Sequence, residues 1–144
     1  MLKGIDPLLG PDLLHVLAMM GHGDEIVIVD ANFPAASVGE QTVYGSPLAI
    51  GCDAIKALAA ILSVLPLDAF EPDPVVTMQV VGEPDTVPPA IADALPIIKA
   101  EGYEPASLER FDFYQRASEA FAIVATSEMR PYGNFILRKG VIFS

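Results

Sequence analysis

A short run of β-branched residues without a polar interruption constrains this chain more than any other feature. Residues 26–29 read Ile-Val-Ile-Val, and Asp30 ends the run. Runs of this length and composition are typical of a strand that is covered on both faces. Immediately before the run, two glycines flank His22. The sequence therefore predicts a short buried strand with an imidazole on the loop before it and a carboxylate at its end.

Helices and further strands alternate along the rest of the chain. Helices are predicted over residues 12–20, 48–65, 90–100 and 110–118, and strands over 75–81, 103–108, 121–126 and 134–137. We expect Asp12 to cap the first helix and Pro66 to end the second, whereas Pro96 is unfavourable inside the third. A turn at residues 131–133 joins the last two strands. This order predicts one α/β domain over residues 1–144, a three-layer α/β/α fold with a mostly parallel, mixed sheet.

The charge balance narrows the classes of partner. Eight Lys and Arg residues stand against 19 Asp and Glu residues, a formal net charge of −11. Such a surface repels phosphate backbones and anionic membranes, so neither nucleic acid nor a membrane is an expected partner. The longest apolar stretch, residues 57–67, is shorter than the about 20 residues of a spanning helix. Cys52 is the only cysteine, so no internal disulfide can form, and a cytoplasmic location is expected.

Apolar residues are more abundant than in a typical small domain. The hydrophobic residues make up 52% of the chain. Counted with glycine and without tyrosine, the apolar share also exceeds the about 45–50% of ordinary globular domains. Because a small chain has little interior in which to place this surplus, we expect part of its surface to be buried between subunits.

His22 and Asp30 are the first candidates for chemistry. The chain has two histidines, and histidine is the side chain best suited to proton transfer near neutral pH. The glycines beside His22 allow a close approach to a ligand, whereas His15 is predicted on a helix surface. Asp30 follows a buried strand, where α/β sheets place ligand-binding groups, although an aspartate there also serves as a turn residue.

Two later segments carry further polar candidates. Arg110 can recognise hydroxyl or carboxylate groups with its guanidinium, or it can form a salt bridge with Glu109 or Asp112. The segment 132–134, Tyr-Gly-Asn, is a turn sequence that also presents a phenol and an amide. No metal-ligand spacing, phosphate-binding glycine loop or nucleophile elbow is present.

Eight segments in order resemble one known family over nearly the whole chain. These segments are residues 1–3, 11–14, 20–26, 30–35, 110–114, 120–126, 132–134 and 139–141. Together they are similar to the fucose mutarotase and ribose pyranase family. Several matches in the same order are far more specific than any one of them.

The resemblance implies an activity, a set of site residues and an assembly. Members interconvert the cyclic forms of a free, neutral monosaccharide without a cofactor or a metal. The matching histidine, His22, is implied as the catalytic acid/base. The sugar site is implied at Asp30, Arg110, Tyr132, Gly133 and Asn134. Members assemble as ring-shaped homo-oligomers, often decamers, with sites at subunit interfaces.

The fucose branch of the family fits this chain better than the ribose branch, which tends to carry histidine at the position of Arg110. Asn32 and Ser127 depart from the fucose-type pattern, where histidine and glycine are usual, and the loop 36–47 differs as well. We therefore predict a mutarotase acting on L-fucose. Alternatives are a ribose pyranase that interconverts pyranose and furanose rings, a non-catalytic sugar-binding or regulatory protein, and a purely structural oligomer.

The expected reaction needs few groups. Ring opening removes the proton of the anomeric hydroxyl and protonates the ring oxygen, and the open aldehyde rotates and closes on its other face. We expect His22 to carry the proton. Asp30 would fix the tautomer of His22 or hold a sugar hydroxyl, and Arg110, Tyr132 and Asn134 would hold the sugar.

Overall fold

A six-stranded mixed sheet forms the centre of the computed structural model, which describes all 144 residues. The strands are β1 (Glu25–Val29), β2 (Leu48–Ala49), β3 (Val75–Met78), β4 (Ala106–Leu108), β5 (Ala122–Ala125) and β6 (Phe135–Arg138). Their order across the sheet is β2-β5-β1-β6-β3-β4. All neighbours are parallel except those of β6, which runs antiparallel to both β1 and β3.

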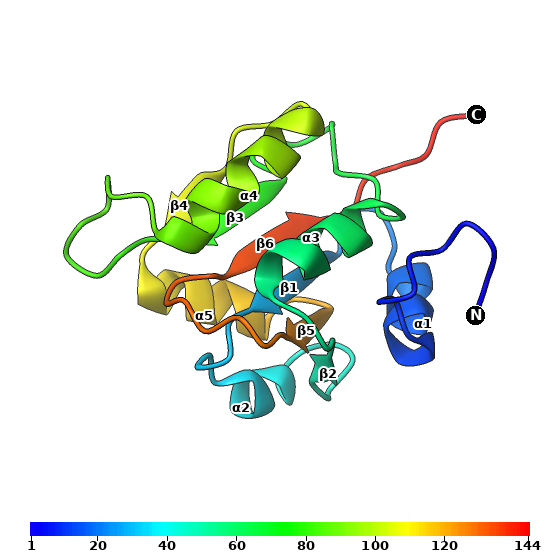
Figure 1. Cartoon of the computed structure of the whole chain (residues 1–144), viewed down its shortest axis with the longest axis horizontal. Helices are drawn as coiled ribbons and strands as arrows, with labels where there is room; N and C mark the ends of the chain where they lie inside the picture. The colour runs from blue at the N-terminus through cyan, green and yellow to red at the C-terminus, as the bar shows by residue number, and fades with distance from the viewer.

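Helices cover both faces of this sheet (Figure 1). They are α1 (Pro11–Met19), α2 (Ala35–Gly39), α3 (Ala54–Leu62), α4 (Pro89–Ala100) and α5 (Arg110–Ser118). α3 and α4 pack on one face and α2 and α5 on the other, while α1 lies beside the sheet. The prediction of a three-layer α/β/α fold with a mostly parallel sheet is confirmed. None of the helices has the length and apolarity needed to cross a lipid bilayer.

The central strand β1 divides its side chains between two cores. Ile26 and Ile28 belong to the larger cluster with α1, α3 and α4, whereas Val27 and Val29 belong to the smaller cluster with α2 and α5. All four are fully buried. Because successive side chains of a strand point to opposite faces, a run without polar residues is what a two-sided strand requires. Each such side chain contributes about 1.5–3 kcal/mol of burial free energy.

Three local predictions are wrong. Residues 48–49 are not helical but pair with β5, and the helix begins only at Ala54, after Asp53 accepts a hydrogen bond from the Lys56 backbone N–H at 2.8 Å. The loop expected before residue 47 contains the short helix α2. Asp12 does not cap α1, because Gly10 holds the N-cap position and Pro11 opens the helix.

The helix predicted over residues 110–118 is confirmed with these bounds. The strands predicted over residues 75–81 and 103–108 are shorter in the structure, since β3 ends at Met78 and β4 begins only at Ala106. Pro96 lies inside α4 on its exposed side, where the missing N–H costs least. The last two strands, β5 and β6, follow one another in sequence but are not neighbours, since β1 lies between them. Because β6 pairs with β1 in this order, the turn before β6 lies beside the end of β1.

Candidate functional site

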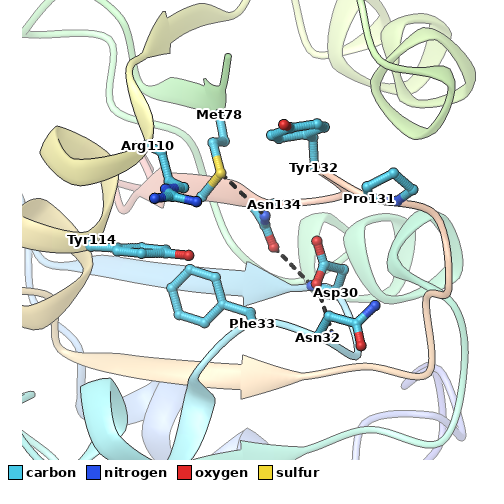
Figure 2. A pocket seen from close by; sticks show the side chains of 9 residues that line it. All are labelled: Asp30, Asn32, Phe33, Met78, Arg110, Tyr114, Pro131, Tyr132 and Asn134. Atoms are coloured by element: carbon cyan, nitrogen blue, oxygen red, sulfur yellow. Dashed lines mark hydrogen bonds between the residues drawn. The ribbon is translucent and has the colours of Figure 1, made fainter. Parts of the chain in front are cut away.

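A pocket of about 170 Å³ opens where β1 and β3 end and β6 begins. Because β6 runs antiparallel, its first residue, Phe135, lies opposite Ile28 of β1 and Thr77 of β3. Side chains that follow β1, end β3 and precede β6 therefore meet at one edge. The lining residues, drawn in Figure 2, are Asp30, Asn32, Phe33, Met78, Arg110, Tyr114, Pro131, Tyr132 and Asn134. The volume is below the about 300–1,000 Å³ of pockets for drug-sized ligands, so a smaller ligand fits.

Asp30 and Asn134 are tied together at the floor of this pocket. The Asp30 backbone N–H donates to Asn134 Oδ1 at 2.8 Å, and Asn134 Nδ2 points to the Met78 sulfur at 3.7 Å (Figure 2). The Asn32 backbone N–H donates to Asp30 Oδ1 at 3.0 Å, a turn contact of the kind aspartate makes after strands. Asp30 Oδ2 receives no such contact, so this nearly buried carboxylate keeps an oxygen with which to accept a hydroxyl of a ligand.

Arg110 enters the pocket from the first position of α5. Its side chain forms a salt bridge with neither Glu109 nor Asp112, and Glu109 instead caps the helix by accepting from the N–H groups of Phe111 and Asp112. The guanidinium carbon lies 4.5 Å from the centre of the Phe111 ring. Nε of Arg110 is the one buried side-chain polar atom without a hydrogen-bond partner. An unsatisfied buried donor costs about 1–3 kcal/mol, and a ligand that brings an acceptor removes this cost.

Tyr132 lines the pocket, and Gly133 follows it in the same turn. Tyr132 has a φ of 63°, which is uncommon for a residue with a side chain, and its hydroxyl accepts the Val81 N–H at 3.3 Å. The hydroxyl proton of Tyr132 therefore remains free to donate. Gly133 does not line the pocket. A Cβ there would lie 2.9 Å from Cγ of Glu128, so the close packing of the turn requires glycine.

The aromatic part of the pocket was not singled out in the sequence. Phe33 and Tyr114 pack edge to face with ring centres 5.2 Å apart, and Met78 completes the apolar lining. One signal was available for Tyr114: it follows Arg110 by four residues, so both side chains lie on one face of α5. No local signal marks Met78, because its place depends on the pairing of β3 with β6.

His22 lies at the opposite end of β1 and is not among the pocket residues. Its Nε2 lies 3.0 Å from Oδ1 of Asp68, whose side chain is only 1% exposed. The other carboxylate oxygen accepts from Nε of Arg138 at 2.9 Å. The Phe70 backbone N–H, the His22 side chain and the Arg138 guanidinium together lower the pKa of Asp68 to about 2. This carboxylate is therefore ionised at neutral pH beside the imidazole.

One chain cannot bring His22 and the pocket to the same small ligand. The five residues of β1 separate them, and a strand rises ~3.3 Å per residue, so β1 alone spans ~13 Å. The His22 side chain is 47% exposed and points away from this pocket's residues toward Asp68 and Phe70. The structure thus brings together Asp30, Arg110, Tyr132 and Asn134, and it leaves His22 apart.

The structure holds no cluster of three or more His, Cys, Asp or Glu side chains arranged to bind a metal ion. The polar groups of the pocket are instead one carboxylate, one guanidinium, two amides and two phenols. This set provides both donors and acceptors next to aromatic rings. It can bind a small ligand that carries several hydroxyl groups and a partly apolar face.

Known proteins resemble this chain over nearly its full length. The model of the RbsD / FucU transport protein family matches residues 3–142. A fucose mutarotase of Homo sapiens is 44% identical, over 98% of this chain and 94% of the human protein. The crystal structure of the fucose mutarotase from Streptococcus pneumoniae in complex with L-fucose is 39% identical, with a TM-score of 0.85 over 99% of this chain and 100% of that one. FucU from Bifidobacterium longum is 38% identical, with a TM-score of 0.86 over 98% of this chain and 100% of that one.

Proposed function

This chain belongs to the RbsD/FucU family, and we propose that it is a fucose mutarotase, an isomerase that interconverts the α and β anomers of free L-fucose. One observation carries this proposal. A chain 44% identical to a fucose mutarotase gathers Asp30, Arg110, Tyr132 and Asn134 into one small pocket. The hydrogen-bond donors and acceptors of these side chains suit the hydroxyl groups of the expected sugar ligand.

Each pocket group has a role in holding the sugar. Asp30 Oδ2 accepts from one hydroxyl, while the Tyr132 hydroxyl donates to another. The unpartnered Nε of Arg110 donates to a sugar oxygen and so loses its desolvation cost. Phe33 and Met78 face the apolar edge of the sugar, which in L-fucose includes a methyl group. Gly133 contributes through the turn that positions its neighbours, Tyr132 and Asn134.

His22 supplies proton transfer from a second copy of the chain. An imidazole abstracts the proton of the anomeric hydroxyl, the bond from the anomeric carbon to the ring oxygen breaks, and the imidazole returns the proton to that oxygen. Rotation of the aldehyde followed by the reverse steps gives the other anomer. Because His22 lies too far from the pocket of its own chain, each site combines His22 of one protomer with the pocket of its neighbour.

The surface around His22 supports such an assembly. Phe70 lies against the His22 ring, and its ring is tilted toward that of Phe143 with centres 6.0 Å apart. Even so, Phe70 and Phe143 are 62% and 72% exposed. Adjacent exposed aromatic rings are typical of a surface that another subunit covers. A head-to-tail contact of this kind closes into a ring when its rotation permits, and we propose a ring-shaped decamer.

The electrostatics fit a neutral ligand. With a net charge of −11, the chain repels anionic substrates such as sugar phosphates but is indifferent to a free sugar. The single cysteine, Cys52, is buried and free, as is usual for proteins of a reducing compartment, and we propose that the protein works in the cytoplasm.

Saturation-transfer NMR of anomer exchange tests this function. The purified protein is added to L-fucose, D-ribose, D-galactose and L-rhamnose, and the exchange between the anomer signals of each sugar is measured. We expect the largest acceleration on L-fucose. Faster pyranose–furanose exchange of ribose would indicate a pyranase instead. Sugar binding without acceleration would indicate a non-catalytic binding protein, and the absence of both would leave a structural oligomer.

A further inference from the structure

We propose that Asp68 is the positioning residue of the acid/base, and that it holds His22 with Nε2 protonated so that Nδ1 is the nitrogen that exchanges protons with the sugar. This inference rests on the proposed function, because it assigns a partner to His22 in the reaction described above. Neither the sequence pattern nor the pocket pointed to Asp68, which lies 46 residues from His22 in the chain.

The hydrogen bonds around His22 carry the assignment. Oδ1 of Asp68 lies 3.0 Å from Nε2, and Nδ1 makes no hydrogen bond within the chain. A carboxylate that is ionised can only accept, so Nε2 must be the donor and carry the proton. In a neutral imidazole the other nitrogen, Nδ1, then holds the free lone pair. Asp68 thus fixes the tautomer of His22 by accepting the hydrogen bond of Nε2, the nitrogen that does not react with the sugar.

Hydrogen bonds fix both the carboxylate and the backbone of Asp68 in place. Its Oδ1 also accepts the Phe70 backbone N–H at 3.0 Å, and its Oδ2 accepts from Arg138 at 2.9 Å. The Asp68 backbone N–H donates to the Arg138 carbonyl, which ties the segment to the end of β6. A Cβ at Gly140 would lie 2.8 Å from the Asp68 Cα, so the two segments are in close backbone contact. A side chain anchored in this way can orient an imidazole that is half exposed.

Asp68 also stabilises the positive charge that His22 acquires during the reaction. When Nδ1 takes the proton of the anomeric hydroxyl, the imidazole becomes a cation between that hydroxyl and Asp68. The negative charge of Asp68 stabilises this cation, and the proton then leaves from Nδ1 to the ring oxygen. Asp68 itself neither gains nor loses a proton. Arg138 keeps the carboxylate in place and keeps the nearly buried aspartate from being an unpaired charge.

The tautomer of His22 is measured first, on the wild-type protein, so that no variant needs to fold. Two-bond ¹H–¹⁵N correlation spectra of protein labelled only in histidine distinguish a protonated from an unprotonated ring nitrogen. Only two histidines are present, and His15→Ala identifies the signal of His22. At a pH where His22 is neutral, we expect Nε2 to carry the proton and Nδ1 to be bare. A proton on Nδ1 overturns the proposal.

The Asp68→Asn variant tests the consequence. Asparagine keeps the size of the side chain but removes the charge and lets its amide turn either way, so we expect a mixture of the two His22 tautomers. Loss of the partner that orients a metal-bound histidine costs about 10–100-fold, and we expect a loss of similar size in the maximal exchange rate on L-fucose. The half-saturating sugar concentration should stay within about twofold, because Asp68 does not touch the sugar.

Glu25→Gln is the matched control. Glu25 also pairs with an arginine, Arg116, and lies at the same end of β1, but it forms no hydrogen bond or salt bridge with His22. We expect the rate and the His22 spectrum of this variant to match wild type. A rate of Asp68→Asn within about twofold of wild type would overturn the positioning role. If wild type accelerates no sugar, the proposed function fails, while the tautomer spectrum still decides whether Asp68 fixes the imidazole.

Discussion

We expect the replacement of His22 by alanine to slow anomer exchange on L-fucose by about 10²–10⁴-fold, the usual contribution of a positioned acid/base group. The fold should persist, because the imidazole is 47% exposed and Asp68 keeps its contacts with Arg138 and Phe70. Binding of L-fucose should weaken only slightly, since the pocket residues of Figure 2 are unchanged. Saturation-transfer NMR gives the rate, and titration calorimetry gives the affinity.

The second histidine provides the control for this prediction. His15 is exposed on α1 and makes no hydrogen bond with another side chain, so His15→Ala should retain the wild-type rate. If His22→Ala kept full activity as a folded protein, proton transfer would have to come from another group. In that case Asp30 would become the first candidate, as the one carboxylate inside the pocket.

Replacing Phe113 by alanine should destabilise the protein by about 3–5 kcal/mol, the cost of removing a fully buried aromatic ring. Phe113 is 0% exposed and fills the smaller core between α5 and the sheet. Its ring packs edge to face with that of Phe33, with centres 6.1 Å apart, and Phe33 lines the pocket. The variant should therefore also bind L-fucose more weakly than wild type.

Chemical denaturation at one fixed protein concentration measures this loss, because the stability of an oligomer depends on concentration. Phe111→Ala on the same helix is the comparison, since Phe111 is 63% exposed and lies outside both cores. We expect it to change the free energy of unfolding by less than about 1 kcal/mol. Equal losses for the two variants would mean that the smaller core does not anchor α5.

Strong local signals identified the central strand and the helix α5 from the sequence. The run 26–29 is typical of a strand covered on both faces, and the structure shows such a strand. The helix predicted over residues 110–118 has these bounds in the structure, where Glu109 caps it. The segment 48–65 was wrongly predicted as one helix, because its apolar composition does not distinguish a helix from a two-residue strand followed by a loop. Asp53, an N-cap residue in mid-segment, was the available signal.

The candidate site could be predicted only in part. Asp30, Arg110, Tyr132 and Asn134 come from different elements, and the resemblance named them before the structure brought them together. The position of His22 at the far end of the strand from Asp30 was already visible in the sequence, and strand geometry alone separates the two. Asp68 could not be found this way, because its contact with His22 depends on how residues 66–68 pair with residues 138–140.

The central claim is that each site joins His22 of one protomer to the pocket of another, and mixed oligomers test it most directly. Two variants that we expect to be inactive on their own are His22→Ala, which lacks the acid/base group, and Arg110→Ala, which lacks a pocket residue. They are unfolded together at equal concentrations and refolded, and anomer exchange on L-fucose is measured. A random mixture restores about a quarter of the sites, because one interface in four pairs an intact His22 with an intact pocket. Refolding each variant alone should restore none. Activity that stays at the level of the separate variants, in oligomers shown to contain both chains, would contradict the shared site.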